Sequence, residues 1–238
     1  MLYIGIDLGT SACKLLLVDG SGAVLREVTK EYPLSFPQPG WSEQAPEDWW
    51  KAVMQGMSEL LCGFDAAQVV GIGAGGQMHG LVALDEDDNV IRPAILWNDG
   101  RTAKEVDYLN NEIGKGKLSR YTANIAFAGF TAPKLLWMRE NERSNFAKIR
   151  KIMLPKDYIN YKLTGIHCTD YSDASGTLLL DVEHKRWSWK MCQICGVTEE
   201  QLPKPYESWE TVGTLKADVA KELGLPESVK VCAGAGDN

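Results

Sequence analysis

The sequence contains no apolar run long enough to cross a membrane, and its first residues include no basic segment followed by an apolar export signal. Positive charge is also scarce. The chain has 25 lysines and arginines against 32 aspartates and glutamates, a formal net charge of −7. General nucleic-acid binders instead present basic faces to the phosphate backbone. We therefore expect a cytoplasmic protein that binds neither membranes nor nucleic acid.

Motifs for several common chemistries are missing as well. There is no GxxxxGK[ST] phosphate loop, and no HExxH or clustered His/Cys spacing for a transition metal. Six cysteines are scattered along the chain, and we interpret the lone CxxC pair Cys192 and Cys195 as reduced structural thiols. The acidic run DEDDN at residues 85–89 lies between short apolar runs and is interpreted as a solvated turn. His167 and His184 lie in polar segments with no expected role.

What is present predicts a globular α/β protein. Of the 238 residues, 45% are hydrophobic and 24% are charged, as in ordinary soluble domains. Aliphatic and β-branched runs predict strands, and apolar residues at helical spacing predict helices between them. We expect one domain over residues 1–238, with a mixed sheet, flanking helices and a helical insertion. The expected strands are residues 2–7, 13–18, 23–28, 69–75, 81–85, 94–99 and 229–236, and the expected helices begin near residues 46, 102, 132, 155 and 218.

The helix expected from Pro46 has the clearest pattern. Proline suits a first helical position, and Glu47 and Asp48 suit the positive end of the helix dipole. One face carries apolar side chains at helical spacing: Trp49, Trp50, Val53, Met57, Leu60 and Leu61. We expect this face to pack in the core.

A carboxylate lies where the first expected strand meets a tight turn. In DLGTS, Asp7 precedes Gly9, Thr10 and Ser11. The glycine lets the backbone approach a ligand closely, and the hydroxyl and N–H groups can bind phosphate oxygens. Asp7 is suited to a magnesium shell, because one or two carboxylates suffice for an ion that keeps several waters. An ordinary hairpin turn remains the alternative.

A second carboxylate ends the chain's last apolar strand. The segment VKVCAGAGDN leads through glycines to Asp237, which is placed to take a proton from a substrate hydroxyl. A glycine-rich turn with a solvated aspartate is the alternative. Together, Asp7 and Asp237 suggest a metal–phosphate acid and a base on either side of a cleft.

Two further segments combine aromatic, amide, charged and imidazole groups after expected strands. A small polyhydroxylated ligand needs such a mixture of apolar walls and fixed donors and acceptors. A structural role for the histidine and core packing for the tryptophan remain open at this point. The residues concerned are Gln77, Met78 and His79 in GAGGQMHG, and Trp97, Asn98, Asp99 and Arg101 in LWNDGR.

These segments, taken in order, resemble the N-terminal domain of the FGGY carbohydrate kinases, and within that family the kinases of xylulose. The resemblance spans essentially the whole chain. It is carried by YIGIDLGTSACK, WSEQAPEDWW, GAGGQMHG, RPAILWNDGR, GFTAPKLLWMREN, LPKDYINYKLTG, TDYSDASGTLLLD and GAGDN. It implies an actin-like ATPase fold of the ribonuclease-H type. It also implies phosphorylation of D-xylulose to D-xylulose 5-phosphate with ATP and Mg²⁺.

The resemblance also implies residue roles. Asp237 would be the general base on the sugar hydroxyl, and Asp7 the second essential acid, near Mg²⁺ and the phosphates. The residues expected near the transferred phosphate are Gly9, Thr10, Ser11 and Lys14. The residues expected to contact the sugar or support its pocket are Gln77, Met78, His79, Trp97, Asn98, Asp99, Arg101 and Asn238.

Members of this family carry a second domain of similar size after the GDN motif, with most of the nucleotide site. We expect that C-terminal domain to be absent from this chain, and the chain alone to turn over little or no sugar. The surface that would meet it could also drive self-association into a homodimer. Two alternatives remain open: a kinase for ribulose, gluconate, glycerol or another polyol, and a non-catalytic sugar-binding module.

Overall fold

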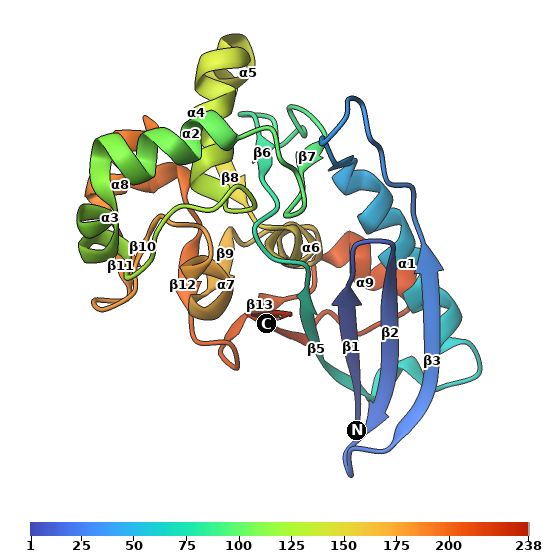
Figure 1. The fold of residues 1–238 in the computed structure, drawn as a ribbon. Coiled ribbons are helices and arrows are strands. Elements are labelled where there is room, and N and C mark those ends of the chain that lie inside the picture. The colour runs from blue at the N-terminus through green and yellow to red at the C-terminus, as the bar shows by residue number, and fades with distance from the viewer. Residues whose placement is uncertain (238) are drawn as a thin grey trace.

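In the computed structural model, which describes residues 1–237, the chain folds around a mixed seven-stranded sheet, as the sequence predicts (Figure 1). Its order is β13-β14-β5-β1-β2-β3, and β15 also pairs with β5. β5 runs parallel to β1, β14 and β15, whereas the other pairs are antiparallel. The strands are β1 (Leu2–Leu8), β2 (Ala12–Asp19), β3 (Val24–Glu31), β5 (Val69–Gly76), β13 (Thr211–Thr214), β14 (Lys230–Cys232) and β15 (Ala235–Gly236).

One face of this sheet carries the main core. Along β1, Leu2, Ile4, Ile6 and Leu8 are buried, and the residues between them are exposed or half-buried. Helix α1 (Pro46–Leu61) packs on the buried side against β2 and β3. It begins at Pro46 as predicted, and all its predicted core residues are buried except the half-buried Trp50.

Two more helices cover the same face. α6 (Pro155–Thr164) and α9 (Ala217–Leu223) pack against α1, and their apolar residues join the same core cluster. On the opposite face, Tyr3 and Asp7 are exposed. The sheet therefore presents the Asp7 side to solvent. No helix within residues 1–237 is both long and apolar enough to span a membrane.

The predicted helical insertion forms a second apolar cluster beside the sheet (Figure 1). Leu109, Leu135, Trp137 and Met191 are buried in it. A seven-residue π-helix, Tyr108–Gly114, follows α2 directly. The helices of this part are α2 (Ala103–Asp107), α3 (Lys115–Thr122), α4 (Thr131–Asn141), α5 (Arg143–Lys148), α7 (Tyr171–Ser175) and α8 (Trp189–Cys195).

Short strands tie the two parts together, and several were not predicted. β8 (Lys151–Met153) interrupts the region read as helical and pairs with β6 (Val82–Leu84). Three residues give no periodicity from which to recognise a strand. The remaining elements are β4 (Glu43–Gln44) with β7 (Ala94–Ile95), β9 (Cys168–Asp170) with β12 (Lys204–Tyr206), β10 (Leu180–Asp181) with β11 (Arg186–Trp187), and the 3₁₀ turns Ala66–Gln68 and Glu199–Gln201.

The expected last strand, residues 229–236, is broken at Gly234 into β14 and β15. Gly234 has φ +79°, and a Cβ there would lie 1.8 Å from the carbonyl oxygen of Ala74. Only glycine fits so close to β5 in this conformation. The break leads the chain from β14 to the separate strand β15, which ends beside Asp237.

The cysteines and the acidic run occupy the places expected for structural groups. Cys192 and Cys195 are buried free thiols on α8, and burial raises their pKa values to about 11 and about 12. Asp85 accepts hydrogen bonds from the backbone N–H groups of Asp87 and Asn89, so DEDDN forms a turn.

Candidate active site

The two candidate carboxylates meet at one edge of the central sheet. Asp7 pairs with Gly75 across β1 and β5, and Gly75 pairs with Ala235 of β15. The N–H of Asp237 then donates to the carbonyl of Gly76 at 3.1 Å. Adjacent strands are spaced about 4.8 Å apart, so the main chains of Asp7 and Ala235 lie roughly 10 Å apart, and Asp237 follows two residues later. Both residues are exposed.

The strand between these acids carries no side chain at this level. Gly75 and Gly76 end β5, and a Cβ on Gly76 would lie 2.5 Å from the carbonyl oxygen of Leu8. Paired residues of parallel strands point to the same face, and alternation returns Asp237 to the face of Ala235. Asp7 and Asp237 therefore flank an open gap floored by glycine backbone.

The hairpin turn after Asp7 is fixed by buried amides. Gly9 N–H donates to Ala12 at 3.0 Å, and a Cβ on Gly9 would lie 2.9 Å from that oxygen. The closed turn itself therefore requires this glycine. Gln77 Nε2 donates to the Gly9 carbonyl at 3.3 Å and to Gln44 Oε1 at 3.2 Å. Gln77 is 1% exposed and supports the turn from below, instead of facing solvent.

Polar groups on the outer side of the turn remain accessible. Ser11 is exposed, and Lys14 lies opposite Asp7 on β2. The Lys14 ammonium pairs with Glu27 at 3.2 Å. Within residues 1–237 the Asp7 carboxylate has no ion-pair or hydrogen-bond partner. It is therefore free to bind a ligand.

Trp97 closes one side of the turn. Its Nε1 donates to Thr10 Oγ1 at 3.0 Å, and its side chain is half exposed. A Cβ on Gly129 would lie 2.4 Å from the Trp97 carbonyl oxygen, so glycine is required behind it. Asn98 faces elsewhere: it lines a hollow of about 450 Å³ with the proline-rich loop 36–42.

Met78 and His79 lie against two glycines from distant segments. A Cβ on Gly236 would lie 2.7 Å from Met78 Cγ, which places Met78 beside the strand that leads to Asp237. A Cβ on Gly176 would lie 2.3 Å from His79 Cε1. The Phe130 ring lies 4.7 Å from the imidazole, centroid to centroid. Met78 and His79 are therefore held by close packing, Met78 beside β15 and His79 beside the loop after α7.

His79 has a strained backbone and a defined imidazole tautomer. Its φ is +67°, unusual for a residue other than glycine. Its carbonyl accepts from Lys134 Nζ at 2.8 Å and from Thr131 Oγ1 at 3.1 Å. Its Nδ1 lies 3.0 Å from the carbonyl of Gly176, which can only accept. Nδ1 therefore carries the proton, and Nε2 keeps a free lone pair.

Burial keeps this imidazole neutral. Desolvation, and then the charge of Lys134, lower the pKa of His79 to about 4. Lys134 is itself fully buried, and desolvation holds its pKa well below the usual value. Its ammonium nitrogen donates to the carbonyls of His79 and Gly129. The pocket thus offers a neutral acceptor, with Lys134 directed at the backbone.

Asp99 and Arg101, like Gln77, have buried side chains. Arg101 Nη2 lies 2.7 Å from both Asp99 Oδ2 and Glu43 Oε1. Its guanidinium stacks 3.7 Å from the Trp41 ring centroid, and Asp99 accepts from the Ser42 N–H at 2.6 Å. These two side chains do not face a ligand. They fix the segment that carries Trp97.

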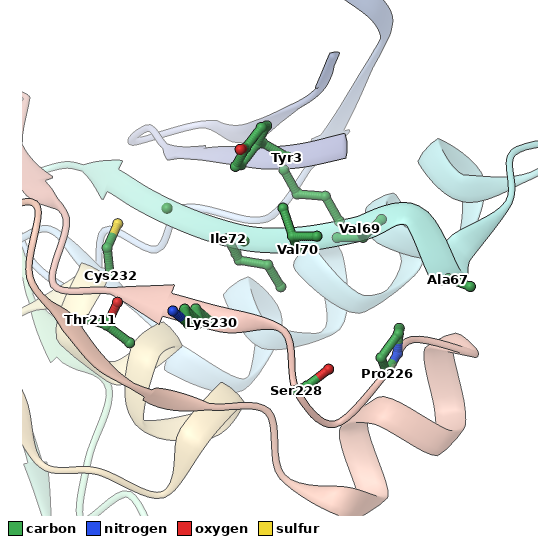
Figure 2. Close-up of a pocket in the computed structure, with 13 residues that line it drawn as sticks. Tyr3, Ala67, Val69, Val70, Ile72, Thr211, Pro226, Ser228, Lys230 and Cys232 are labelled. Carbon is green, nitrogen blue, oxygen red and sulfur yellow. The ribbon is translucent and has the colours of Figure 1, made fainter. Parts of the chain in front are cut away.

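One hollow in the described chain lies away from the acids. About 610 Å³ in volume, it opens on the exposed face of the sheet between β5 and β14 (Figure 2). Tyr3 stands on one side of it, and Thr211 and Lys230 on the other. Neither Asp7 nor Asp237 lines it. The candidate site is therefore identified by its two carboxylates and their neighbours, and not by this hollow.

Several site residues were not singled out from the sequence. Phe130, Lys134 and Gly176 shape and hold His79, yet they lie 51, 55 and 97 positions from it along the chain. All three lie in segments quoted for the family resemblance, GFTAPKLLWMREN and TDYSDASGTLLLD, but no role was predicted for them individually. Their role depends on contacts between segments, which local patterns do not reveal.

Comparison with known proteins finds similarity to carbohydrate kinases. The model of the FGGY family of carbohydrate kinases, N-terminal domain, matches residues 2–238. The chain is 44% identical to a xylulose kinase of Escherichia coli over 237 residues, covering 100% of this chain and 48% of that protein.

Solved structures show the same likeness. A xyloylose kinase from Brucella ovis aligns with a TM-score of 0.96 and 44% identity, covering 100% of this chain and 49% of that one. A gluconate kinase from Lactobacillus acidophilus aligns with a TM-score of 0.94 and 30% identity, covering 99% of this chain and 48% of that one. These sugar kinases confirm the actin-like ATPase fold.

The matches cover essentially all of this chain but only part of each relative. The chain spans about half the length of the curated relatives it matches. The match to the family model runs through every segment that builds the site, from the turn after Asp7 to Asp237. The chain therefore belongs to the FGGY family of carbohydrate kinases, whose N-terminal domain it matches.

Proposed function

We propose that this chain is the sugar-side domain of a kinase that transfers phosphate from ATP to D-xylulose, giving D-xylulose 5-phosphate. One observation carries the proposal: two exposed carboxylates, Asp7 and Asp237, flank a strand end without side chains, beside Met78 and His79. The name xylulose kinase, carried by relatives 44% identical along the whole chain, supports the choice of sugar.

Asp237 acts as the base on the sugar. As the sugar hydroxyl oxygen attacks the γ-phosphorus of ATP, the bond to the departing ADP oxygen breaks and the hydroxyl proton passes to the Asp237 carboxylate. Its exposure and its place at the end of β15 leave it open to a substrate. Asn238, expected beside it, lies outside the described residues, and its role remains a prediction.

Asp7 is the residue that would hold Mg²⁺, and its surroundings fit that ion. Its carboxylate is exposed, and within residues 1–237 it has no partner. No group of three metal-binding side chains forms in the described chain, and an ion held by one carboxylate, phosphates and water needs none. The ion would balance phosphate charge. Thr10 and Ser11, at the adjacent turn, would donate to phosphate oxygens, with Lys14 nearby.

The sugar lies between the acids and the Met78–His79 segment. His79 Nε2 accepts from a sugar hydroxyl, and Met78 and the Trp97 ring supply apolar walls. Gln77, Asp99 and Arg101 act indirectly by holding these segments. Asn98 faces the proline-rich loop, where it would line the rim of the pocket.

In this proposal a second domain, of the kind that the longer relatives have room for, supplies most of the ATP site and closes the cleft. The support is the twofold greater length of the relatives and the open face of the sheet beside Asp7. Without closure the site stays wet, and electrostatic stabilisation of the transferred phosphoryl group is weakened.

The test is Asp237→Ala in the complete two-domain protein, with kcat and the KM for D-xylulose measured. We expect kcat to fall about 10³-fold or more and KM to change only a few-fold, because the base acts in the transition state. Asp218→Ala, which removes an exposed aspartate from α9, is the matched control and should keep full activity. Loss of sugar binding with unchanged turnover would remove Asp237 as the base.

The gluconate kinase similarity favours one rival, a kinase for another sugar on the same fold. D-xylulose, L-ribulose, gluconate and glycerol should therefore be compared with the unaltered protein. We expect D-xylulose to give the highest kcat/KM. Turnover of another substrate would keep the kinase and reject the sugar, and binding without phosphate transfer would indicate a non-catalytic module.

A further inference from the structure

A cluster of charged side chains that the reaction does not use directly lies behind the segment 232–236, which leads to Asp237. Lys156 on α6 is fully buried, and its ammonium nitrogen lies 2.7 Å from Asp157 and 3.1 Å from Asp170. Asp173, on α7, lies 4.0 Å away. Three buried carboxylates thus surround one ammonium. Buried ion clusters are costly to desolvate and contribute little net stability, so this one calls for another explanation.

The cluster ends on the backbone of the segment that carries Asp237. Lys156 Nζ donates to the Ala233 carbonyl at 3.2 Å. Asn160, one turn further along α6, donates to the same carbonyl at 2.9 Å and to that of Cys232 at 3.3 Å. These carbonyls lie where the strand break at Gly234 interrupts the sheet ladder. The helix therefore supplies hydrogen bonds that the sheet does not.

A second arm reaches the segment from α7. Asp170 Oδ2 accepts from Ser172 Oγ at 2.5 Å and from Ser208 Oγ at 3.0 Å. Ser172 Oγ in turn accepts from the Gly236 N–H at 3.4 Å, and the Ser208 carbonyl accepts from the Gly234 N–H at 3.0 Å. Residues 232–236 are thus held by hydrogen bonds along both edges.

We propose that Lys156, Asn160, Asp170 and Ser172 form a positioning network that fixes residues 232–236 and thereby aims Asp237 at the sugar hydroxyl. The inference rests on the proposed role of Asp237. Its physical reason is that a strand broken by glycine is intrinsically loose, while a base must stay within hydrogen-bond reach of its proton.

Asp173, the third carboxylate around Lys156, lies next to this network. Both of its carboxylate oxygens are buried without a hydrogen-bond partner among the described residues. Desolvation holds its pKa well above the usual value, and the nearby charge of Asp237 adds to the shift. The raised pKa favours the neutral form of Asp173, which limits the negative charge near Asp237.

The test variants are chosen to keep the fold. Lys156→Met would leave three buried carboxylates without a cation and is expected not to fold. Asn160→Leu preserves volume and removes the donors to Cys232 and Ala233. Ser172→Ala, at an exposed position, removes the acceptor for Gly236. Lys162→Met, at a half-buried position of the same helix outside the network, is the control.

Amide hydrogen exchange of this chain gives the first readout. In Asn160→Leu and Ser172→Ala we expect the amides of Gly234, Gly236 and Asp237 to exchange about tenfold faster or more, while those of β1 and β2 are unchanged. Unchanged exchange at residues 234–237, or equal acceleration everywhere, would overturn the positioning role.

Kinetics of the complete protein give the second readout. Asn160→Leu should lower kcat about tenfold or more and leave the KM for sugar nearly unchanged, because misplacement of the base affects the transition state most. Faster exchange with normal kcat would overturn the link to Asp237. Asp237→Ala tests the base independently, so failure of the network and failure of the proposed function remain distinguishable.

Discussion

His79 is the residue whose surroundings are most completely specified. Its backbone has φ +67°, Lys134 and Thr131 bind its carbonyl, and Gly176 binds its Nδ1. Residues held in sparsely populated backbone conformations cluster at functional sites, where the surrounding structure compensates the strain. The network around His79 serves that purpose, and it leaves Nε2 as the group free to bind a ligand.

A titration of His79 is the prediction at this scale. Its pKa of about 4 lies below the ordinary 6.5, so between these values the unfolded chain binds a proton that the folded chain does not. Because only the unfolded chain is protonated in this range, the free energy of unfolding is highest above pH 6.5 and decreases as the pH falls toward 4. NMR of the imidazole C–H signals should show a midpoint near 4 for the signal that His79→Gln removes. A midpoint near 6.5 would contradict the burial argument.

At the scale of elements, the sequence predicts the strands and helices whose apolar residues recur at a regular spacing. The β1–β2 hairpin, β3, β5 and α1 follow from alternation or helical spacing and are confirmed. The prediction of a wholly helical region from residue 102 to about 163 was wrong at β8, because a three-residue strand has no period and its partner β6 lies about 70 positions away. The break between β14 and β15 depends on the closeness of Gly234 to Ala74, a tertiary fact.

In the candidate site, too, local patterns were predictable from the sequence and tertiary contacts were not. Asp7 and Asp237 were predicted as a pair because each is flanked by glycine at a strand end, and the register brings those strand ends together. Asp99 and Arg101 looked like pocket residues because Glu43, the second partner of Arg101, lies more than 50 positions away and cannot be identified from the sequence. Charged residues near a motif do not reveal whether they face a ligand or one another.

The loop after α7 provides a prediction at this scale. Gly176→Ala introduces a Cβ that would lie 2.3 Å from His79 Cε1, so the imidazole must move. The backbone there is right-handed, so no strain accompanies the change. We expect the KM for sugar in the complete protein to rise about tenfold or more, since one lost hydrogen bond to a buried group costs 1–3 kcal/mol.

Gly116→Ala is the matched control, because Gly116 lies on α3 with open space around it. It should leave sugar affinity unchanged and stabilise the helix slightly. An unaltered KM in Gly176→Ala would show that the position of His79 does not determine sugar binding.

At the scale of the whole molecule, the exposed sheet face is the feature that local patterns leave unexplained. α1, α6 and α9 all cover the other face, whereas Tyr3 and Asp7 face solvent. A hollow of about 610 Å³ opens beside Tyr3. One wall of a cleft can bind a sugar, yet it cannot exclude water from a transferred phosphoryl group. Self-association through this face remains a prediction.

The isolated chain should therefore bind without reacting. Residues 1–238 should unfold cooperatively, because each of the two apolar clusters is continuous. D-Xylulose should raise the midpoint of thermal unfolding, since a ligand that binds only the folded state stabilises it. With ATP and Mg²⁺ present, we expect a turnover at least about 10³-fold below that of the two-domain protein, because positioning and closure are missing. Gly176→Ala should reduce the thermal shift at a given sugar concentration. Efficient phosphorylation by the isolated chain would show that closure by a second half is unnecessary.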